Sequence, residues 1–220
     1  RKTKLKKDQM HLEILTFASK VSSHLALLES AKYFKVSIHI IGIGERISFR
    51  AFYKKIDADW IKKHTGVYQR RVSSIDVDQM GAIAAKEAIG NKKVPDCIIN
   101  ASGVPKQTLP DTSVFIQKEL GLSGIPSFTI HSTCLSFIVA LNTAASFISQ
   151  GVYKRILIIS ADRGTRGRNY NQAESAALLG DAAAAIIVEK TPMNETSKYM
   201  DFSMKTWPEG SSLTEVRGGG

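Results

Sequence analysis

A cysteine stands where a strand is expected to give way to a helix. The segment HSTCLSF (residues 131–137) follows a β-branched run that ends near Ile130, and it precedes a long apolar stretch. Ser132 and Thr133 are common N-cap residues, so a helix is expected to begin at or just before Cys134. The helix dipole and the unpaired N–H groups at that point favour a thiolate, the nucleophilic form of cysteine. The pattern therefore makes Cys134 a candidate nucleophile.

The alternative for Cys134 is a small hydrophobic core residue. The residues that follow it, 135–148, are almost entirely apolar, which predicts a buried helix with a rigid tip shielded from water. The only other cysteine, Cys97, opens the apolar strand CIIN and fits the core alternative well. Two cysteines do not make a disulfide framework, and they favour a reducing, intracellular setting. Local context by itself leaves both interpretations of Cys134 open.

The elements that must position these cysteines alternate along the chain. Apolar strands separated by helices of about 10–15 residues predict an α/β layered fold with a largely parallel sheet. The strands are expected at 35–44, 97–102, 127–130, 155–160 and 182–189, and the helices near 76–90, 111–120 and 134–149.

Composition sets the broad class. The chain has 220 residues, of which 43% are hydrophobic and 23% charged, which is typical of a globular protein with one large domain or two. No uncharged apolar run approaches the roughly 20 residues of a membrane-spanning helix. The sequence shows no internal repeat and no low-complexity block.

The net charge of +10 is concentrated near the N-terminus, where residues 1–35 hold eight Lys or Arg and three acidic residues. No recognised nucleic-acid module accompanies this basic segment, so nucleic-acid binding is not predicted. A solvated basic tail and a site for an acidic small partner both fit. Apolar positions near helical spacing over 8–34 indicate an amphipathic helix, and the segment could be a targeting peptide or translated upstream sequence.

Five motifs follow one another along the chain. They are SIHIIGIGERIS, DADWIKKHTGVYQRR, LPDTSVFIQKELGLSGIPSFTIHSTCLSFIVAL, RILIISADRGTR and LLGDAAAAIIVE. They keep a common register, which is far more specific than any single match. On these motifs, the chain from Val36 to Gly220 resembles the N-terminal half of a β-ketoacyl-acyl carrier protein synthase III, a thiolase-fold condensing enzyme.

The resemblance implies an organisation as well as a fold. Residues 36–220 are expected to form one βα half of a thiolase-like domain, with a mixed, mostly parallel sheet and a buried central helix. Residues 1–35 are then a basic, helical or disordered extension. A second half of similar size is expected to be absent from this sequence. Without that half, a large apolar face of the first half would stay uncovered.

The resemblance also implies a reaction. Cys134 would take an acyl group from acyl-CoA as a thioester, and its backbone N–H would donate to the oxyanion. The acyl-enzyme would then condense with malonyl-ACP or malonyl-CoA and release CO₂. No tightly bound cofactor and no metal is implied. Acyl-CoA, acyl carrier protein and a second copy of the chain in a homodimer are the implied partners, in the cytoplasm.

Four further residues gain roles by resemblance. Trp60 and Arg166 match positions that sandwich the adenine of CoA, where stacking and cation–π contacts suit a flat base. The alternatives are a core anchor for Trp60 and a solvated loop charge for Arg166. Arg70 matches an arginine that serves as a phosphate contact or a structural contact. Leu109 matches a position where an aromatic residue often reaches the acyl pocket of the partner subunit.

The chain departs from the family pattern at several positions. HSTCLSF replaces the more usual small-residue pattern AACAGF, and Ala182 and Ala184 stand where glycines are common. His64 replaces an arginine that contacts CoA. The histidine and asparagine that assist decarboxylation have no match in this chain. His131 lies three residues before Cys134, where it could favour the thiolate, although a satisfied polar side chain is the favoured role.

Two other functions stay open at this point. An acyltransferase of the same fold would pass the acyl group from Cys134 to an alcohol or an amine. A non-catalytic partner subunit would support a second, catalytic chain, although the cysteine at position 134 argues against that.

Overall fold

The computed structural model covers most of the chain after residue 57. The described residues are 39–41, 45–47, 58–169, 171, 176, 178–195, 197 and 199–213. The predicted extension at 1–35 lies outside them, so the division at residue 36 stays a prediction.

Five strands form one mixed sheet in the order β1-β7-β6-β4-β5. β4 (Cys97–Asn100) pairs in parallel with both β5 (Ser127–Thr129) and β6 (Arg155–Arg163). β7 (Asp181–Glu189) is antiparallel to β6 and to β1 (His39–Ile41). Four of these strands therefore run the same way and β7 is reversed, which confirms the predicted mixed, mostly parallel sheet.

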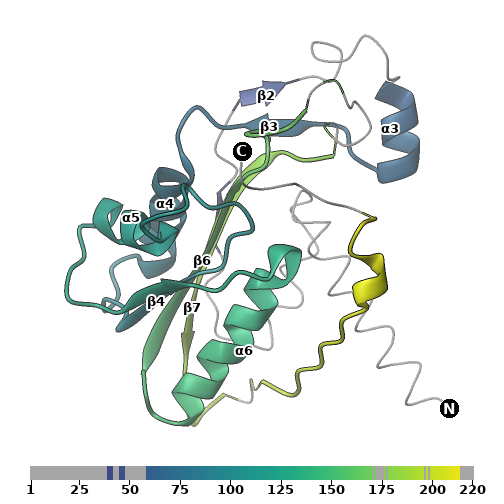
Figure 1. Ribbon diagram of the computed structural model, residues 1–220. Coiled ribbons are helices and arrows are strands. Elements are labelled where there is room, and N and C mark those ends of the chain that lie inside the picture. The colour runs from purple at the N-terminus through teal and green to yellow at the C-terminus, as the bar shows by residue number, and fades with distance from the viewer. Residues whose placement is uncertain are drawn as a thin grey trace, which may run out of the picture.

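Helices cover both faces of this sheet (Figure 1). α4 (Val77–Ile89) and α5 (Thr112–Glu119) pack on one face, and α6 (Ser136–Ser149) packs on the other. The central strands are consequently buried on both sides, and every residue of β4 is buried. Such strands need continuous apolar runs, which is why CIIN and RILII were visible as strands in the sequence.

Packing of α4 on the sheet depends on Gly81, which has no side chain. A Cβ added at Gly81 would lie 3.2 Å from the side chains of both Ile116 and Ile159. Helix, neighbouring helix and sheet therefore approach closely at this point. The helix begins with a capping box, in which Asp76 accepts from the first turn and the Gln79 side chain faces the Asp76 N–H.

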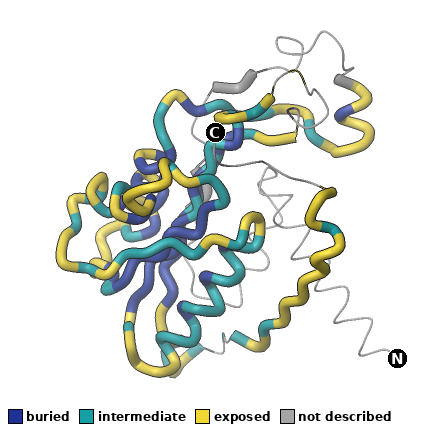
Figure 2. The backbone as a smooth tube through the Cα atoms, viewed as in Figure 1, coloured by how far each residue is buried: buried dark blue, intermediate teal, exposed yellow. Residues whose placement is uncertain are grey.

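α6 is buried along one stripe only. Ser136, Ala140 and Ala144 are buried at a spacing of four residues, and most of the other side chains are partly exposed (Figure 2). Small residues on this stripe let the helix lie close to the sheet. The helix was expected to be buried all round because nearly every residue is apolar. Among the described residues nothing covers its outer face to that extent.

Outside the five-stranded sheet, the described chain before α4 forms a helix and a second, two-stranded sheet. α3 (Ala58–Thr65) precedes β3 (Arg70–Val72), which pairs antiparallel with β2 (Glu45–Ile47). None of these elements was predicted. The strands have three residues each and carry arginines, so they lack the apolar run that identifies a buried strand. A short 3-10 turn, η4 (Pro208–Gly210), lies near the end of the described chain.

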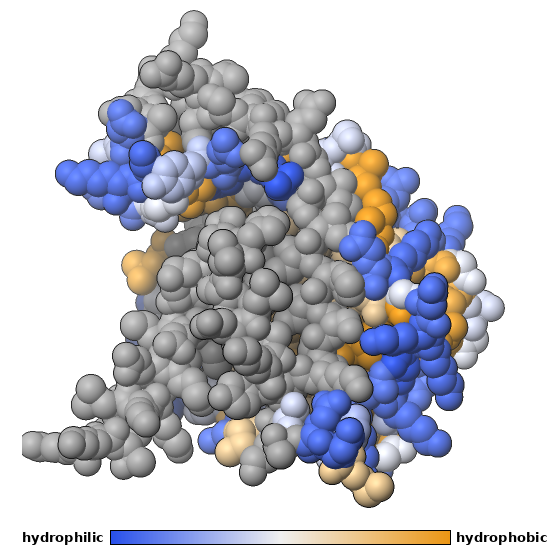
Figure 3. Space-filling model, turned by 180° about the vertical axis from the view of Figure 1, so that it is seen from behind, coloured by the Kyte–Doolittle hydropathy of each residue, from blue (hydrophilic) through white to orange (hydrophobic). Residues whose placement is uncertain are grey.

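Within the described residues, no helix is long and apolar enough to cross a bilayer. Seen from behind, the described surface is mostly hydrophilic, with hydrophobic patches between the charged side chains (Figure 3).

Candidate active site

The carboxyl ends of β4 and β5 meet beside the candidate nucleophile. The Ile130 N–H donates to the Asn100 carbonyl at 2.9 Å, and the Ala101 N–H donates to the Ile159 carbonyl at 2.6 Å. The chain therefore leaves the sheet at two adjacent points, into the loop at 101–104 and the turn at 131–135. In open α/β sheets, this edge is where ligands bind.

Cys134 lies in a helical turn that leads into α6. The turn is a 3-10 helix, η3 (Thr133–Leu135), so helical structure begins one residue before the cysteine, as predicted. The predicted capping is wrong, however, because the Ser132 side chain makes no capping hydrogen bond. Ser136 does this work instead: its Oγ accepts from the Ser132 N–H at 2.9 Å and donates to the Thr133 carbonyl at 2.7 Å.

The backbone of this turn is unusual at one residue. Thr133 has a φ of +48°, and it is the only described residue other than glycine with a positive φ. A β-branched residue is disfavoured in that conformation, which persists where its surroundings over-determine it. The turn places Cys134 on the surface, where its side chain is exposed. The expectation of a thiol shielded from water is therefore not met by the described residues.

His131 does not pair with the thiol in this structure. Its Nδ1 lies 3.4 Å from the Ser102 carbonyl oxygen, and the residue is exposed. This contact agrees with the satisfied polar role favoured from the sequence. It also links the turn at 131–135 to the loop that follows β4.

A carboxyl group that the sequence did not reveal as part of the site lies near the loop that contacts the turn at 131–135. Asp162, in the last part of β6, accepts from the Val104 N–H at 2.6 Å and also from the Gly103 backbone and the Ser160 side chain. Burial raises the pKa of the Asp162 carboxyl, against these hydrogen bonds and the nearby His131. Its sequence signal was an acidic residue that directly follows the apolar strand RILIISA.

A chain of hydrogen bonds runs from the end of β4 to α5. Ser102 Oγ donates to Asn100 Oδ1 at 2.7 Å, and Asn100 Nδ2 donates to Thr129 Oγ1 at 3.0 Å. Thr129 Oγ1 in turn donates to Asp111 Oδ1 at 2.7 Å, and Asp111 caps α5 through the Ser113 N–H. Every step pairs a donor with an acceptor, as buried or partly buried polar groups require.

Leu109 lies just before this cap. Its side chain is 80% exposed, and the peptide bond to Pro110 is cis. The residue therefore projects from the described chain.

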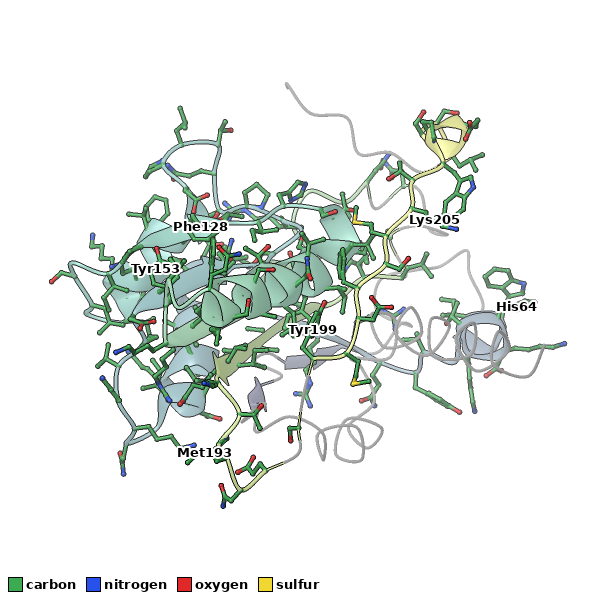
Figure 4. All side chains as sticks on the ribbon, turned by 90° about the horizontal axis from the view of Figure 1, so that it is seen from below. His64, Phe128, Tyr153, Met193, Tyr199 and Lys205 are labelled. Carbon is green, nitrogen blue, oxygen red and sulfur yellow. The ribbon has the colours of Figure 1, made fainter. Side chains whose placement is uncertain are left out.

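Trp60 lies on α3 and is half exposed, which argues against a core anchor. Its ring stacks on His64, with centroids 4.3 Å apart and planes 25° apart. His64 Nδ1 also lies 2.8 Å from the Trp60 carbonyl oxygen. Figure 4 shows His64 at the α3 end of the molecule, well away from Phe128 and Tyr153.

Arg166 is exposed and bound to the cap of α4. Its Nη1 donates to both carboxylate oxygens of Asp76, at 3.0 and 3.1 Å. Partial burial by itself raises the pKa of Asp76, but the Val77 N–H and the guanidinium outweigh it and lower that pKa. Arg166 is thus oriented rather than a solvated loop charge.

Arg70 has structural contacts. Its Nε donates to the Leu178 carbonyl at 3.0 Å, and burial, with the nearby charge of Arg168, lowers the pKa of Arg70 to about 10. These contacts join β3 to the segment before β7. They favour the structural alternative for Arg70 over the phosphate contact.

The carboxyl end of β6 lies next to β3, which carries Arg70. Arg163, at the end of β6, donates from its guanidinium to the Ser73 carbonyl directly after β3 at 2.8 Å. The β2–β3 pair and α3 lie beyond that end (Figure 1). Trp60 and Arg166 have different partners, His64 and Asp76. Among the described residues, no three His, Cys, Asp or Glu are grouped as metal ligands would be.

Comparisons with known proteins agree with this architecture. Residues 128–208 match the family model described as 3-oxoacyl-[acyl-carrier-protein (ACP)] synthase III. The chain is 37% identical over 139 residues to the β-ketoacyl-[acyl-carrier-protein] synthase III of Rhizobium johnstonii, covering 60% of this chain and 43% of that protein. The same enzyme of Prochlorococcus marinus strain MIT 9312 is 30% identical over 202 residues, 86% of this chain and 59% of that protein.

A solved structure extends the match to three dimensions. The crystal structure of 3-oxoacyl-[acyl-carrier-protein] synthase III from Aquifex aeolicus superposes with a TM-score of 0.66 at 28% identity, covering 71% of this chain and 52% of that one. The resemblance and the thiolase-like fold predicted from the motifs are confirmed. The chain spans about half the length of the relatives it matches.

Proposed function

We propose that this chain, a relative of the β-ketoacyl-acyl carrier protein synthase III proteins, uses Cys134 to accept an acyl group from acyl-CoA. The observation that carries the proposal is the position of the thiol. Cys134 is exposed in a helical turn at the carboxyl edge of the sheet, inside the segment that matches the family model. A thioester substrate can therefore reach it from solvent.

The first half-reaction needs few groups. The Cys134 thiolate attacks the thioester carbonyl of acyl-CoA, and the resulting oxyanion accepts a hydrogen bond from the Cys134 backbone N–H. Collapse of this intermediate forms an acyl-cysteine thioester and releases CoA as its thiolate. Attacking and leaving groups are both thiolates, so their basicities are well matched.

The second half-reaction belongs to the whole protein. A malonyl thioester, on acyl carrier protein or CoA, would lose CO₂, and its carbanion would attack the acyl-cysteine carbonyl. The new C–C bond forms as the Cys134 thiolate leaves. The histidine and asparagine expected for this step are not matched by residues of this chain, so its proposed share of the reaction is acyl acceptance.

The CoA end of the substrate would meet Trp60 and Arg166. A half-exposed indole and an oriented guanidinium are both planar groups on which adenine can stack. Arg70 would act indirectly, by holding the segment before β7 through Leu178. Leu109, which projects from the chain, would meet the acyl pocket of a second copy in a homodimer.

Intact-mass measurement after incubation with acetyl-CoA or octanoyl-CoA tests the proposal. Wild type and Cys97→Ala are expected to gain the mass of one acyl group, and Cys134→Ala none. Hydroxylamine, which cleaves thioesters, should remove the adduct. An adduct that persists in Cys134→Ala, or its absence from all three proteins of full coding length, would contradict the assignment.

A further inference from the structure

One charged side chain beside the cysteine turn has no part in the proposed chemistry. Asp162 follows the buried core of β6, and its Oδ1 accepts from the Val104 N–H at 2.6 Å. The Gly103 backbone and the Ser160 side chain also donate to this carboxylate. Asp162 thereby ties the loop after β4 to the end of β6, which is the neighbouring strand.

The loop that Asp162 holds lies directly against the turn of the nucleophile. A Cβ added at Gly103 would lie 3.6 Å from both Asp162 Oδ1 and the Thr133 carbonyl oxygen. The Ser102 carbonyl lies 3.4 Å from His131 Nδ1, at the start of the same turn. Ser102 thus contacts His131 and Gly103 lies close to Thr133, so the loop neighbours residues on both sides of Ser132.

The turn needs such support. Thr133 holds a φ of +48°, and the Ser136 hydroxyl accepts from the Ser132 N–H and donates to the Thr133 carbonyl from inside the helix. A strained backbone persists where its neighbours leave no room to relax. Gly103 lies beside the Thr133 carbonyl, close enough that an added methyl group would be in ordinary van der Waals contact with it. Movement of this loop would therefore let Thr133 relax and would displace the residue that follows it.

We propose that Asp162 is a positioning residue for Cys134. It holds the loop at 101–104 against Thr133, and the loop keeps the turn in the shape that presents the thiol. Its effect on acyl transfer rests on the proposed function, whereas its effect on the turn does not.

The other end of β6 supplies a matched control. Asp96 accepts from the Lys154 N–H at 2.9 Å and from the Arg155 N–H at 3.0 Å, just before β4 begins. Like Asp162, it is a carboxylate that joins the ends of β4 and β6 through backbone N–H groups. It lies at the amino ends of these strands, away from the cysteine turn.

The test compares Asp162→Asn with Asp96→Asn in the full-length protein. Hydrogen exchange of a peptide spanning 130–137 is measured by mass spectrometry, together with the rate of acyl-adduct formation at saturating acetyl-CoA. Asp162→Asn is expected to speed exchange in this peptide about tenfold, because a hydrogen bond to a charged group is weakened. It should slow adduct formation by a similar factor with little change in KM for acetyl-CoA. Asp96→Asn should leave both quantities unchanged.

Equal exchange in Asp162→Asn and wild type, or equal acceleration in Asp96→Asn, would overturn the proposal. If Asp162→Asn does not fold, Asp162→Glu moves the carboxylate by one methylene relative to the Val104 N–H and should also accelerate exchange at 130–137, and no acceleration would again overturn the proposal. Failure of the proposed function shows separately, as an absence of adduct in wild type while exchange still depends on Asp162.

Discussion

The two cysteines lie in opposite surroundings, Cys97 in the sheet and Cys134 in the turn that leads into α6. Cys97 is the first residue of β4, has no exposed surface, and packs with Ile99, Ile156 and Ala144. Cys134 is exposed beyond the carboxyl end of the same strand. Burial first, and then the Asp96 carboxylate, raise the pKa of the Cys97 thiol to about 11. The same residue type therefore lies in two different environments, and the fold rather than the residue type sets the difference.

The difference follows from the direction of the strands. The amino end of β4 packs into the core, and its polar neighbour Asp96 is used to accept backbone N–H groups. At the carboxyl end lie Asn100, Ser102 and Asp162, and hydrogen bonds link these residues to one another and to nearby loops. Polar groups gather where parallel strands end because the chain leaves the sheet there. Cys134, the proposed nucleophile, lies at that end and is exposed.

The largest expected effect is a difference in alkylation. With iodoacetamide at pH 8, the native protein should be modified at Cys134 and not at Cys97, because a thiol whose pKa is about 11 is almost wholly protonated and Cys97 is buried. The rise from 9.0 to about 11 lowers the thiolate fraction of Cys97 about a hundredfold relative to an ordinary cysteine, so the two rates should differ by at least about a hundredfold. Peptide mass spectrometry measures both sites. In urea the two rates should converge, and similar rates in the native state would remove the contrast between the two ends.

A second prediction concerns the amino end by itself. Asp96→Ala removes the acceptor for the Lys154 and Arg155 N–H groups and should lower the free energy of unfolding by about 1–3 kcal/mol. Urea unfolding followed by circular dichroism gives this value. The alkylation rate of Cys134 should not change at low denaturant. A change there would show that the two ends are coupled through the sheet.

The third prediction tests the strained residue at the carboxyl end. Thr133→Gly should raise the free energy of unfolding by up to about 1 kcal/mol, because relief of a positive φ of 48° exceeds the added entropy of the unfolded chain. Thr143→Gly, inside α6, is the matched control and should lower it by about 1 kcal/mol. The same urea titration measures both variants. A loss of stability in Thr133→Gly would mean that the threonine conformation is not strained.

The smallest effect is the pH dependence of the carboxyl end. The raised pKa of Asp162 means that the folded state binds its proton more tightly than the unfolded state. Its contribution to stability is therefore greatest below the ordinary value of 3.8 and is lost as the pH rises through the raised pKa. The difference in unfolding free energy between wild type and Asp162→Asn should fall over this range.

Asp76→Asn provides the opposite trend. The pKa of Asp76 is lowered, so its contribution is present above 3.8 and is lost as the pH falls through the lowered value. If the unfolding free energies of both variants, relative to wild type, changed with pH in the same direction, the opposite pKa shifts of Asp162 and Asp76 would be contradicted.

Much of the layered fold could be predicted from local pattern. The helices expected near 76–90 and 111–120 are α4 and α5, and the strand expected at 182–189 is β7, which begins one residue earlier. Long apolar runs and capping residues identify such elements because burial and hydrogen bonding act locally. The strand expected at 155–160 continues to Arg163, because β7 pairs with it along its whole length. Only the partner strand shows that extension.

The sequence predicted the central residue of the candidate site, Cys134, but not the residues that contact its turn and loop. Cys134 was identified by the junction and by the matched motifs. Asp162 escaped notice because its role depends on Gly103 and Val104, which lie about sixty residues earlier in the chain and meet it only through the sheet. The orientation of Arg166 on Asp76 likewise depends on a pair that is distant in sequence.

By itself the sequence determined the long strands and helices of the five-stranded sheet layers, the family resemblance, and a cysteine at a strand-to-helix junction. Hydrophobic period and residue order contain that information. The tertiary structure decided which cysteine is exposed, which serine caps the turn, and which carboxylate lies beneath it. These facts depend on contacts between segments far apart in sequence, and only the register of the folded sheet brings those segments together.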